Sequence, residues 1–321
     1  HYRSHSFPTR RSSDLFDNKF IDQSHYSSSD IALEELFFCQ SHDSESKKYA
    51  CIFVHYDKDS LIPADCVHHV EEFSKYCDVF FVSSSESLAE MPEEIQKVEP
   101  FCKQTLIRRN SGYDFGCWSH VIRKNYIQLC NYDGVLLAND SNWGPLHDFS
   151  DTFLKINRLL REVDFVGLTS STTPSWHLQS FFIMYSKKVF KSSYFKQHWF
   201  NIGIQDSKYD IIMSYEVSWC TRLQRLGFDG ASVYGDSSAS NPTHVEWERL
   251  VKSNYPYIKK ELIRDNPLRV DLTELVPILS LYDRDWLSCF LEYLERYGKE
   301  KSLIAELLRS QYMTTSNSCD Q

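Results

Sequence analysis

Three polar residues stand at the end of one apolar run. Residues 134–138 read Gly-Val-Leu-Leu-Ala and are followed directly by Asn139, Asp140 and Ser141. A short apolar run of this kind is typical of a buried strand. A carboxylate at its tip can serve as a hard oxygen ligand for a divalent cation, or it can cap a turn ahead of Gly144. Because no hairpin is evident in the following residues, we favour a functional role for Asp140.

A glycine-punctuated loop carries a second set of polar residues. Residues 110–116 have the pattern Asn-x-Gly-x-Asp-x-Gly. The simplest interpretation is a tight turn that needs positive φ at Gly112 and Gly116. The functional interpretation is that backbone amides beside the two glycines approach a phosphate, while the carboxylate of Asp114 binds a ribose hydroxyl or a metal.

Strands that alternate with helices are expected to position these residues. The alternation predicts an α/β fold with a mostly parallel sheet flanked by helices. Such sheets bind ligands beyond the carboxyl ends of their strands, and His55, Tyr56, Asp57, the 110–116 loop and Asp140 all fall there. We expect strands at 50–57, 78–85, 105–109, 134–140, 164–171, 180–186 and 231–235, and helices at 63–76, 86–98, 117–130 and 208–226.

The chain is expected to hold one large domain between shorter segments. Residues 5–15, HSFPTRRSSDL, match the translation of a common sequencing-library adapter, so we treat residues 1–15 as a scar without fixed structure. The native N-terminus is therefore expected to lie elsewhere. Residues 16–47 lead into an α/β domain at 48–267, and residues 268–321 form a small C-terminal helical extension with an amphipathic segment at 285–298.

Charge excludes one class of partner. Without the first 15 residues the chain has 32 basic and 43 acidic residues, a net charge of −11. A chain this acidic is a poor candidate for nucleic-acid binding, which needs a basic surface. An anionic ligand would need local positive charge, which Arg108 or Arg109 could supply; otherwise both are solvated charges at a strand end.

The cysteines and the apolar runs bear on location. Ten cysteines include no Cys-x-x-Cys pair, which indicates reduced thiols in a cytoplasmic protein. The apolar runs are too short for a membrane span. We therefore expect a cytoplasmic protein, either free or associated peripherally with the inner face of the cytoplasmic membrane.

Taken together, the motifs resemble those of one family. The strand-end pattern resembles the nucleotide-sugar-binding half of a type A glycosyltransferase. More narrowly, the chain is similar to the rhamnan synthesis protein F family over roughly residues 48–267. The blocks that carry the similarity are N-x-G-x-D-F-G-x-W at 110–118, ANDSNWGP at 138–145, FVGLTSS at 165–171, HLQSFFI at 177–183, YEVSWCTRLQRLGF at 215–228 and NPTH at 241–244.

The resemblance implies a fold, a reaction and a metal site. It implies a type A-like (GT-A-like) fold and transfer of rhamnose or a related sugar from a nucleotide donor onto bacterial polysaccharide. In that fold a short acidic motif holds Mg²⁺ or Mn²⁺ against the diphosphate of the donor, whose developing charge the cation neutralises. This implies Asp140 as principal metal ligand, with a late histidine, His244, completing the shell unless it is an ordinary surface or core residue. Asn139 and Ser141 replace the flanking carboxylates of the usual Asp-x-Asp, so we expect weaker metal binding.

Further residues are assigned to the two substrates. For the acceptor or sugar, Trp176 could stack on a sugar ring and His177 and Gln179 could bind hydroxyls; alternatively all three are ordinary residues at a strand edge. Two helix residues, His68 and His69, are expected at the surface. The residues expected to bind the donor are His55, Asp57, Arg109, Asn110, Gly112, Asp114, Asn139 and Ser141.

Glu216 is the expected catalytic base. A capping-box-like segment at 207–210 opens its helix. The apolar stripe of that helix comprises Ile212, Tyr215, Trp219, Leu223 and Leu226. At 100° per residue, Glu216 lies about 60° from the centre of the stripe and is partly desolvated, which suits a base that deprotonates an acceptor hydroxyl. Asp206 and Asp210 are rival bases, and a carboxylate bonded to a backbone amide or to Arg222 is the structural alternative.

The sequence thus predicts an inverting glycosyltransferase. The expected donor is dTDP-rhamnose, and the expected acceptor is a polysaccharide or a lipid-linked oligosaccharide. A carbohydrate-binding protein and a catalytically inactive scaffold of the same fold are the alternatives. A dinucleotide-dependent enzyme is disfavoured, because the first strand is not followed by Gly-x-Gly-x-x-Gly.

Overall fold

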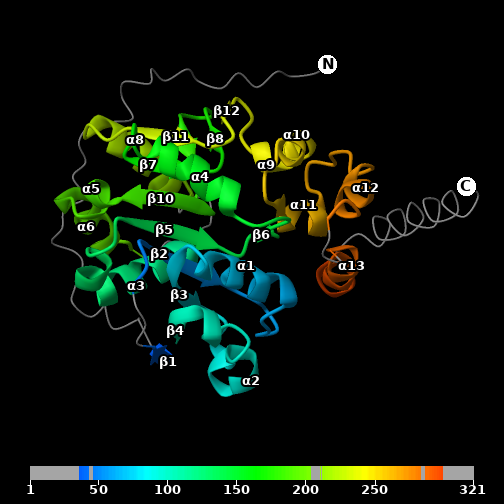
Figure 1. Cartoon of the computed structure of the whole chain (residues 1–321), viewed down its shortest axis with the longest axis horizontal. Helices are drawn as coiled ribbons and strands as arrows, with labels where there is room; N and C mark the ends of the chain where they lie inside the picture. The colour runs from blue at the N-terminus through cyan, green and yellow to red at the C-terminus, as the bar shows by residue number, and fades with distance from the viewer. Residues whose placement is uncertain (1–35, 43–45, 204–209, 211, 283–285, 299–321) are drawn as a thin grey trace, which may run out of the picture.

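A central sheet with eight strands organises the chain (Figure 1). The computed structural model describes residues 36–42, 46–203, 210, 212–282 and 286–298. The strand order is β1-β4-β3-β2-β5-β10-β7-β11. The expected scar at 1–15 lies outside the described residues.

Four neighbouring parallel strands form the predicted half of the sheet. They are β2 (Tyr49–His55), β3 (Cys77–Ser83), β4 (Cys102–Arg108) and β5 (Gly134–Asn139). β2 lies between β3 and β5, and all seven of its residues are buried. A parallel strand that is covered on both faces reads as a continuous apolar run, which explains the segment Ala-Cys-Ile-Phe-Val within β2.

Antiparallel strands complete both sides of the sheet. β10 (Phe182–Ser186) lies antiparallel between β5 and β7 (Phe165–Gly167), and β11 (Gly230–Ser232) runs parallel to β7. β1 (Leu36–Ser41) pairs antiparallel with β4. The sequence reading missed β1, which is a partly exposed edge strand and lacks the long apolar run of a central one. The sheet is mixed and mostly parallel, as predicted.

Helices cover both faces of the sheet. On one face Phe53 of β2 packs with residues of α1 (Ala64–Ser74) and α4 (Ser150–Leu159). On the other face Ile52 packs with α3 (Tyr113–Leu129), α6 (Ser193–Phe200) and α8 (Ser218–Arg225). Successive strand residues therefore enter opposite cores, as the alternation of side chains along a strand requires. This arrangement confirms the predicted α/β, GT-A-like fold.

A third apolar cluster joins the C-terminal helices to the sheet domain. β6 (Asn142–Trp143) pairs with β13 (Ile258–Lys259), and Trp143 packs against Trp286 with ring centroids 4.6 Å apart. The cluster continues through residues 272–294, so it spans the boundary predicted at 267. Its helices lie together beside the sheet (Figure 1). They are α10 (Trp247–Lys252), α11 (Lys260–Asp265), α12 (Leu275–Leu279) and α13 (Trp286–Tyr297).

Two predicted helices differ in form from the expectation. The segment 86–98 is broken into η3 (Glu86–Glu90) and α2 (Pro92–Ile95), because Pro92 cannot continue a helix that began before it. Within the predicted helix 208–226, the described part from residue 212 onward is a π-helix, η5 (Ile212–Val217), followed by α8. The capping-box-like start at 207–209 lies outside the described residues.

Of the two adjacent histidines of α1, which were both expected at the surface, His69 is buried and His68 is partly buried. His69 is 2% exposed, stacks on Phe73 with ring centroids 4.8 Å apart, and lies 2.5 Å from the hydroxyl of Tyr257 through Nε2. Burial lowers the pKa of His69, so a neutral imidazole fills a core position. The ring of His68 packs edge-on against Trp286.

The structure shows the state of the cysteines and the length of the helices, on which the sequence analysis based its expectations. The nine cysteines in the described part of the chain form no disulfide with one another, and six of them are buried. Among the described helices, none combines the length and the apolar character that crossing a bilayer would take.

Candidate active site

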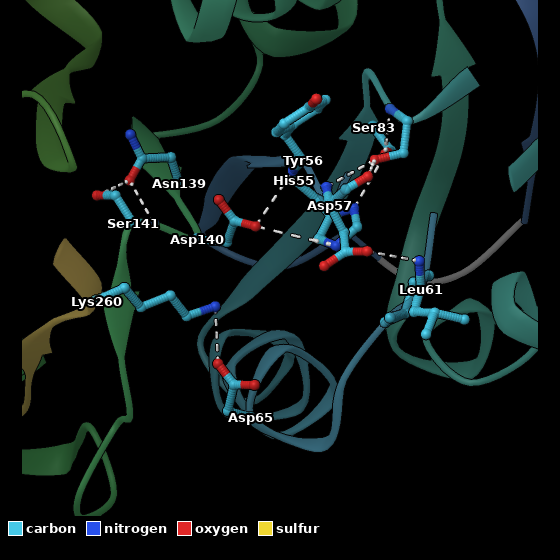
Figure 2. A network of polar contacts seen from close by, with 12 residues as sticks. His55, Tyr56, Asp57, Leu61, Asp65, Ser83, Asn139, Asp140, Ser141 and Lys260 are labelled. Atoms are coloured by element: carbon cyan, nitrogen blue, oxygen red, sulfur yellow. Dashed lines mark hydrogen bonds and ion pairs between the residues drawn. The ribbon is translucent and has the colours of Figure 1, made fainter. Parts of the chain in front are cut away.

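The carboxyl ends of β2, β3 and β5 are joined by polar contacts at Asp140 (Figure 2). The Oδ2 atom of Asp140 accepts a hydrogen bond from the backbone N–H of Tyr56 at 3.2 Å and lies 3.9 Å from Nε2 of His55. The Nδ1 atom of His55 lies 3.0 Å from Oγ of Ser83. Three strand ends thus meet around one carboxylate, whose side chain is 18% exposed.

His55 is a neutral residue under this carboxylate. Its burial lowers the pKa of the imidazole, and the charge of Asp140 only partly opposes that effect. The ring therefore lies beside Asp140 as a neutral group, and at 3.9 Å its Nε2 is too far from the carboxylate for a hydrogen bond.

Asn139 connects the Gly-rich loop to the end of β5. Its Nδ2 donates to Oδ2 of Asp114 at 2.7 Å, while its Oδ1 accepts a bond from Oγ of Ser141 at 2.6 Å. The predicted donor residues Asp114, Asn139 and Ser141 are therefore neighbours of Asp140, as expected from the shared edge of a parallel sheet.

The two glycines of the loop serve different purposes. Gly112 has φ 74° at the N-cap of α3, so its predicted positive φ is correct. The positive φ predicted at Gly116 is wrong, because this residue lies inside α3. A Cβ atom there would lie 2.2 Å from the carbonyl oxygen of Ser111, so Gly116 is required for close approach of the loop.

The two arginines before the loop differ in their exposure to solvent. Arg108 is 2% exposed, and its Nη1 donates to the carbonyl of Ser111 at 2.9 Å, so it holds the loop from inside. Arg109 is exposed. Asn110 is exposed as well, and its backbone N–H donates to Oε1 of Glu86 at 2.9 Å. Of the two arginines, Arg109 is the one with access to an incoming ligand.

Asp57 anchors the loop after β2. Its Oδ1 accepts bonds from the backbone N–H groups of Asp59 at 2.8 Å and Leu61 at 3.1 Å. Its other oxygen accepts a bond from the hydroxyl of Tyr297 in α13. Both carboxylate oxygens are thus engaged within the protein, so Asp57 holds the loop after β2, and its contact with a donor stays a prediction.

Two lysines that the sequence reading missed stand beside Asp140. Lys260 Nζ lies 2.9 Å from Oδ2 of Asp65 and extends toward Asp140 (Figure 2). Burial acts to lower the pKa of Lys260, but the charges of Asp65 and Asp140 raise it overall, so the group is an ammonium. Lys259 Nζ donates to Oγ of Ser141 at 2.8 Å. The only local signal in the sequence is two adjacent lysines after the short apolar run that ends at Ile258.

The side chains around Asp140 do not fit a resident divalent cation. Within the described ranges, no three His, Cys, Asp or Glu side chains gather so that they could hold a metal ion. The single carboxylate of Asp140 faces the ammonium of Lys260, which would repel a cation bound there. His244 is buried, and its Nε2 lies 3.5 Å from Oε2 of Glu261. The expected Mg²⁺ or Mn²⁺ stays a prediction.

Glu216 lines a mainly apolar cavity and has two polar neighbours there. Ser180 Oγ donates a hydrogen bond to Oε2 of Glu216, and Nε2 of His177 lies 3.9 Å from Oε1. The carboxylate is carried by the π-helix η5, a form often found at functional sites, and its side chain is 14% exposed. The cavity is lined by Glu216, Ser180, Phe115, Trp118, Leu137, Ile183, Tyr185, Trp199, Tyr215, Trp219 and Cys220.

The helix that carries Glu216 differs from the α-helix that the sequence predicts. A π-helix turns by less than 100° per residue, so the stripe computed for an α-helix does not hold across 212–217. The partner of the carboxylate is Ser180 rather than a backbone amide or Arg222. Of the rival bases, Asp210 is exposed and Asp206 lies outside the described residues.

The Asp140 and Glu216 clusters share one edge of the sheet. The backbone N–H of Asn139 donates to the carbonyl of Phe181 at 3.3 Å, where β5 and β10 diverge. Ser180, the partner of Glu216, directly precedes Phe181. Asp140 and the serine that bonds Glu216 therefore lie at adjacent strand ends, one just after β5 and the other just before β10.

Trp176 and Gln179 lie near a smaller sheet at the same end. It consists of β8 (Ser170–Ser171), β9 (His177–Leu178) and β12 (Asp236–Ser237). Trp176 Nε1 donates to Oδ1 of Asp236 at 2.9 Å, and Oε1 of Gln179 accepts from Thr169 Oγ1 at 2.7 Å. Contact of Trp176, His177 and Gln179 with a sugar stays a prediction.

The fold and the site define a class of protein. The chain has a mostly parallel sheet with polar side chains beyond the carboxyl ends of its strands, which is the edge where α/β sheets bind ligands. The family model for rhamnan synthesis protein F matches residues 41–314, and the chain belongs to this family. The match includes α12 and α13, beyond the 48–267 segment on which the resemblance was noticed. Membership supports the expectation of a polysaccharide glycosyltransferase.

Individual relatives are more distant. The chain is 27% identical over 165 residues to "Uncharacterized protein y4gN" of Sinorhizobium fredii, a match of 50% of this chain and 42% of that protein. It is 26% identical over 203 residues to "Virulence protein VirA" of Vibrio anguillarum, covering 52% of this chain and 64% of VirA. The matches thus span less than two thirds of the length of either relative.

One solved structure with a similar arrangement is that of S. aureus TarS 1-349. It matches 83% of this chain and 72% of its own chain, with 11% identity and a TM-score of 0.36. At that level of similarity we base the fold assignment on the strand order of this chain itself.

Proposed function

We propose that the chain is a glycosyltransferase that moves a sugar from a nucleotide donor onto a polysaccharide or a lipid-linked oligosaccharide. The observation that supports this proposal is that Asp140, just after β5, and Ser180, which bonds Glu216 just before β10, lie at one edge of the sheet. A lipid-linked acceptor would bring the protein to the inner face of the cytoplasmic membrane as a peripheral protein.

In the proposed reaction Glu216 acts as general base. Its carboxylate takes the proton of an acceptor hydroxyl, and the resulting oxygen nucleophile attacks the anomeric carbon of the donor. The bond between that carbon and the diphosphate oxygen breaks, and its electron pair leaves with the nucleoside diphosphate. Attack from the face opposite the leaving group inverts the anomeric configuration. Ser180 and His177 orient the carboxylate.

The proposed donor is dTDP-rhamnose, in keeping with the family to which the chain belongs. A screen of purified protein against dTDP-rhamnose, UDP-glucose and GDP-mannose, with detection of released nucleoside diphosphate, tests it. We expect dTDP-rhamnose to be hydrolysed fastest. Equal rates with all three donors would contradict the donor assignment, and binding of sugars without any release would favour a carbohydrate-binding protein or an inactive scaffold.

A further inference from the structure

Two lysines of the chain itself supply positive charge close to the Asp140 loop. Lys259 and Lys260 lie at the junction of β13 and α11, and the pairing of Lys259 with Asn142 in β6 sets them against the Asp140 loop. The backbone N–H of Lys260 donates to the carbonyl of Ser141 at 3.0 Å. The two lysines are therefore fixed to the loop by main-chain bonds.

The two side chains extend in different directions, Lys259 toward Ser141 and Lys260 toward Asp65 and Asp140. Lys259 extends to Oγ of Ser141 at 2.8 Å and passes over the ring of Phe181. Lys260 bridges from α11 to Asp65 in the first turn of α1, and its side chain is only 13% exposed. An ammonium in such a low-dielectric position acts strongly on a nearby charge, because little water screens it.

We propose that the ammonium groups of Lys259 and Lys260 bind the diphosphate of the donor and neutralise its charge, in the place where a divalent cation would otherwise act. Asp140 and Asp65 hold the Lys260 ammonium in position. When the bond to the anomeric carbon breaks, the added negative charge on the diphosphate oxygen is met by these donors, which form charge-assisted hydrogen bonds. This inference rests on the proposed function, since it concerns the diphosphate of the same donor.

Binding of the free diphosphates dTDP and UDP tests the inference without relying on turnover. Titration calorimetry is done in excess EDTA and, separately, with Mn²⁺, on the full chain and on Lys259→Met and Lys260→Met. We expect the unaltered protein to bind a diphosphate in EDTA. Each substitution should weaken that binding roughly tenfold or more, the scale of a lost charge-assisted hydrogen bond. Binding of the uncharged nucleosides thymidine and uridine should not change.

Two controls separate binding from folding. Lys252→Met removes an exposed ammonium paired with Glu248 in α10 and should leave diphosphate affinity unchanged. Lys260→Met strands the buried carboxylate of Asp65, so the double variant Asp65→Asn with Lys260→Met removes both partners together and is the better-folded test. Circular dichroism confirms the fold of each variant.

The outcomes are distinguishable. Diphosphate binding that appears only with Mn²⁺, or lysine variants that bind in EDTA like the unaltered protein, would overturn the lysine site while leaving the proposed transferase intact. Absence of diphosphate binding under every condition would overturn the proposed function and this inference with it.

Discussion

Asp140 is the carboxylate around which three strand ends are arranged. Replacing it by asparagine keeps the shape of the side chain but removes the charge that faces Lys260. We expect Asp140→Asn to lower sugar transfer by orders of magnitude while the protein stays folded. Steady-state kinetics of the variant, with and without saturating Mn²⁺, checks this. A rate equal to that of the unaltered protein would remove Asp140 from the mechanism.

Glu216 needs a separate test, because loss of a catalytic base lowers the transfer rate whereas loss of a binding residue lowers donor affinity. Glu216→Gln retains a hydrogen-bonding partner for Ser180 but cannot accept a proton. We expect transfer to fall by about 10²-fold or more, the scale of a lost acid-base group, with donor binding nearly unchanged. Single-turnover transfer measured beside donor affinity separates the two effects. An equal loss of both would mean that Glu216 binds the donor.

At the scale of elements, the tight entry into α3 depends on Gly116. Gly116→Ala would drive a methyl group into the carbonyl of Ser111. We expect a loss of about 1–3 kcal/mol in unfolding free energy, together with weaker donor binding, because the loop that carries Asp114 must shift. Gln128→Ala, at an exposed position of the same helix, is the control, since it changes a side chain of α3 without touching the loop. Urea unfolding and donor titration of both variants test this, and equal effects would argue against a role for the close approach.

At this scale, the sequence predicts the structural features that depend on residues close together in the chain. Buried parallel strands show as apolar runs, and their carboxyl ends share an edge, so the neighbourhood of Asn139, Asp140 and Asp114 could be foreseen. The lysines could not. Lys259 reaches Ser141, 118 positions earlier in the sequence, because two strands of only two residues pair there, and no periodic pattern predicts such a pairing. The π-turn at Glu216 was missed because its residues also suit an α-helix.

For the whole molecule, α13 links the C-terminal helices to the loop after β2. The hydroxyl of Tyr297 donates to Asp57, and Arg296 Nε lies 3.3 Å from Oδ2 of Asp59. Tyr297→Phe removes one hydrogen bond and should lower the unfolding free energy by about 0.5–1.5 kcal/mol. Tyr194→Phe, at an exposed position of α6, should have no such effect. Thermal unfolding of both variants provides the comparison, and identical midpoints would show that the contact adds nothing to stability.

The burial of β2 has a consequence for deuterium labelling. Its seven residues are covered by helices on both faces and by parallel strands on both sides, so most of its amides exchange only when the protein opens broadly. The residues that follow directly, Tyr56 and Asp57, lie at the edge of the site. The exchange rate of a peptide from β2 therefore measures global opening and serves as an internal reference. Slower exchange of the residues just after His55, relative to that reference, would show that a donor occupies the site.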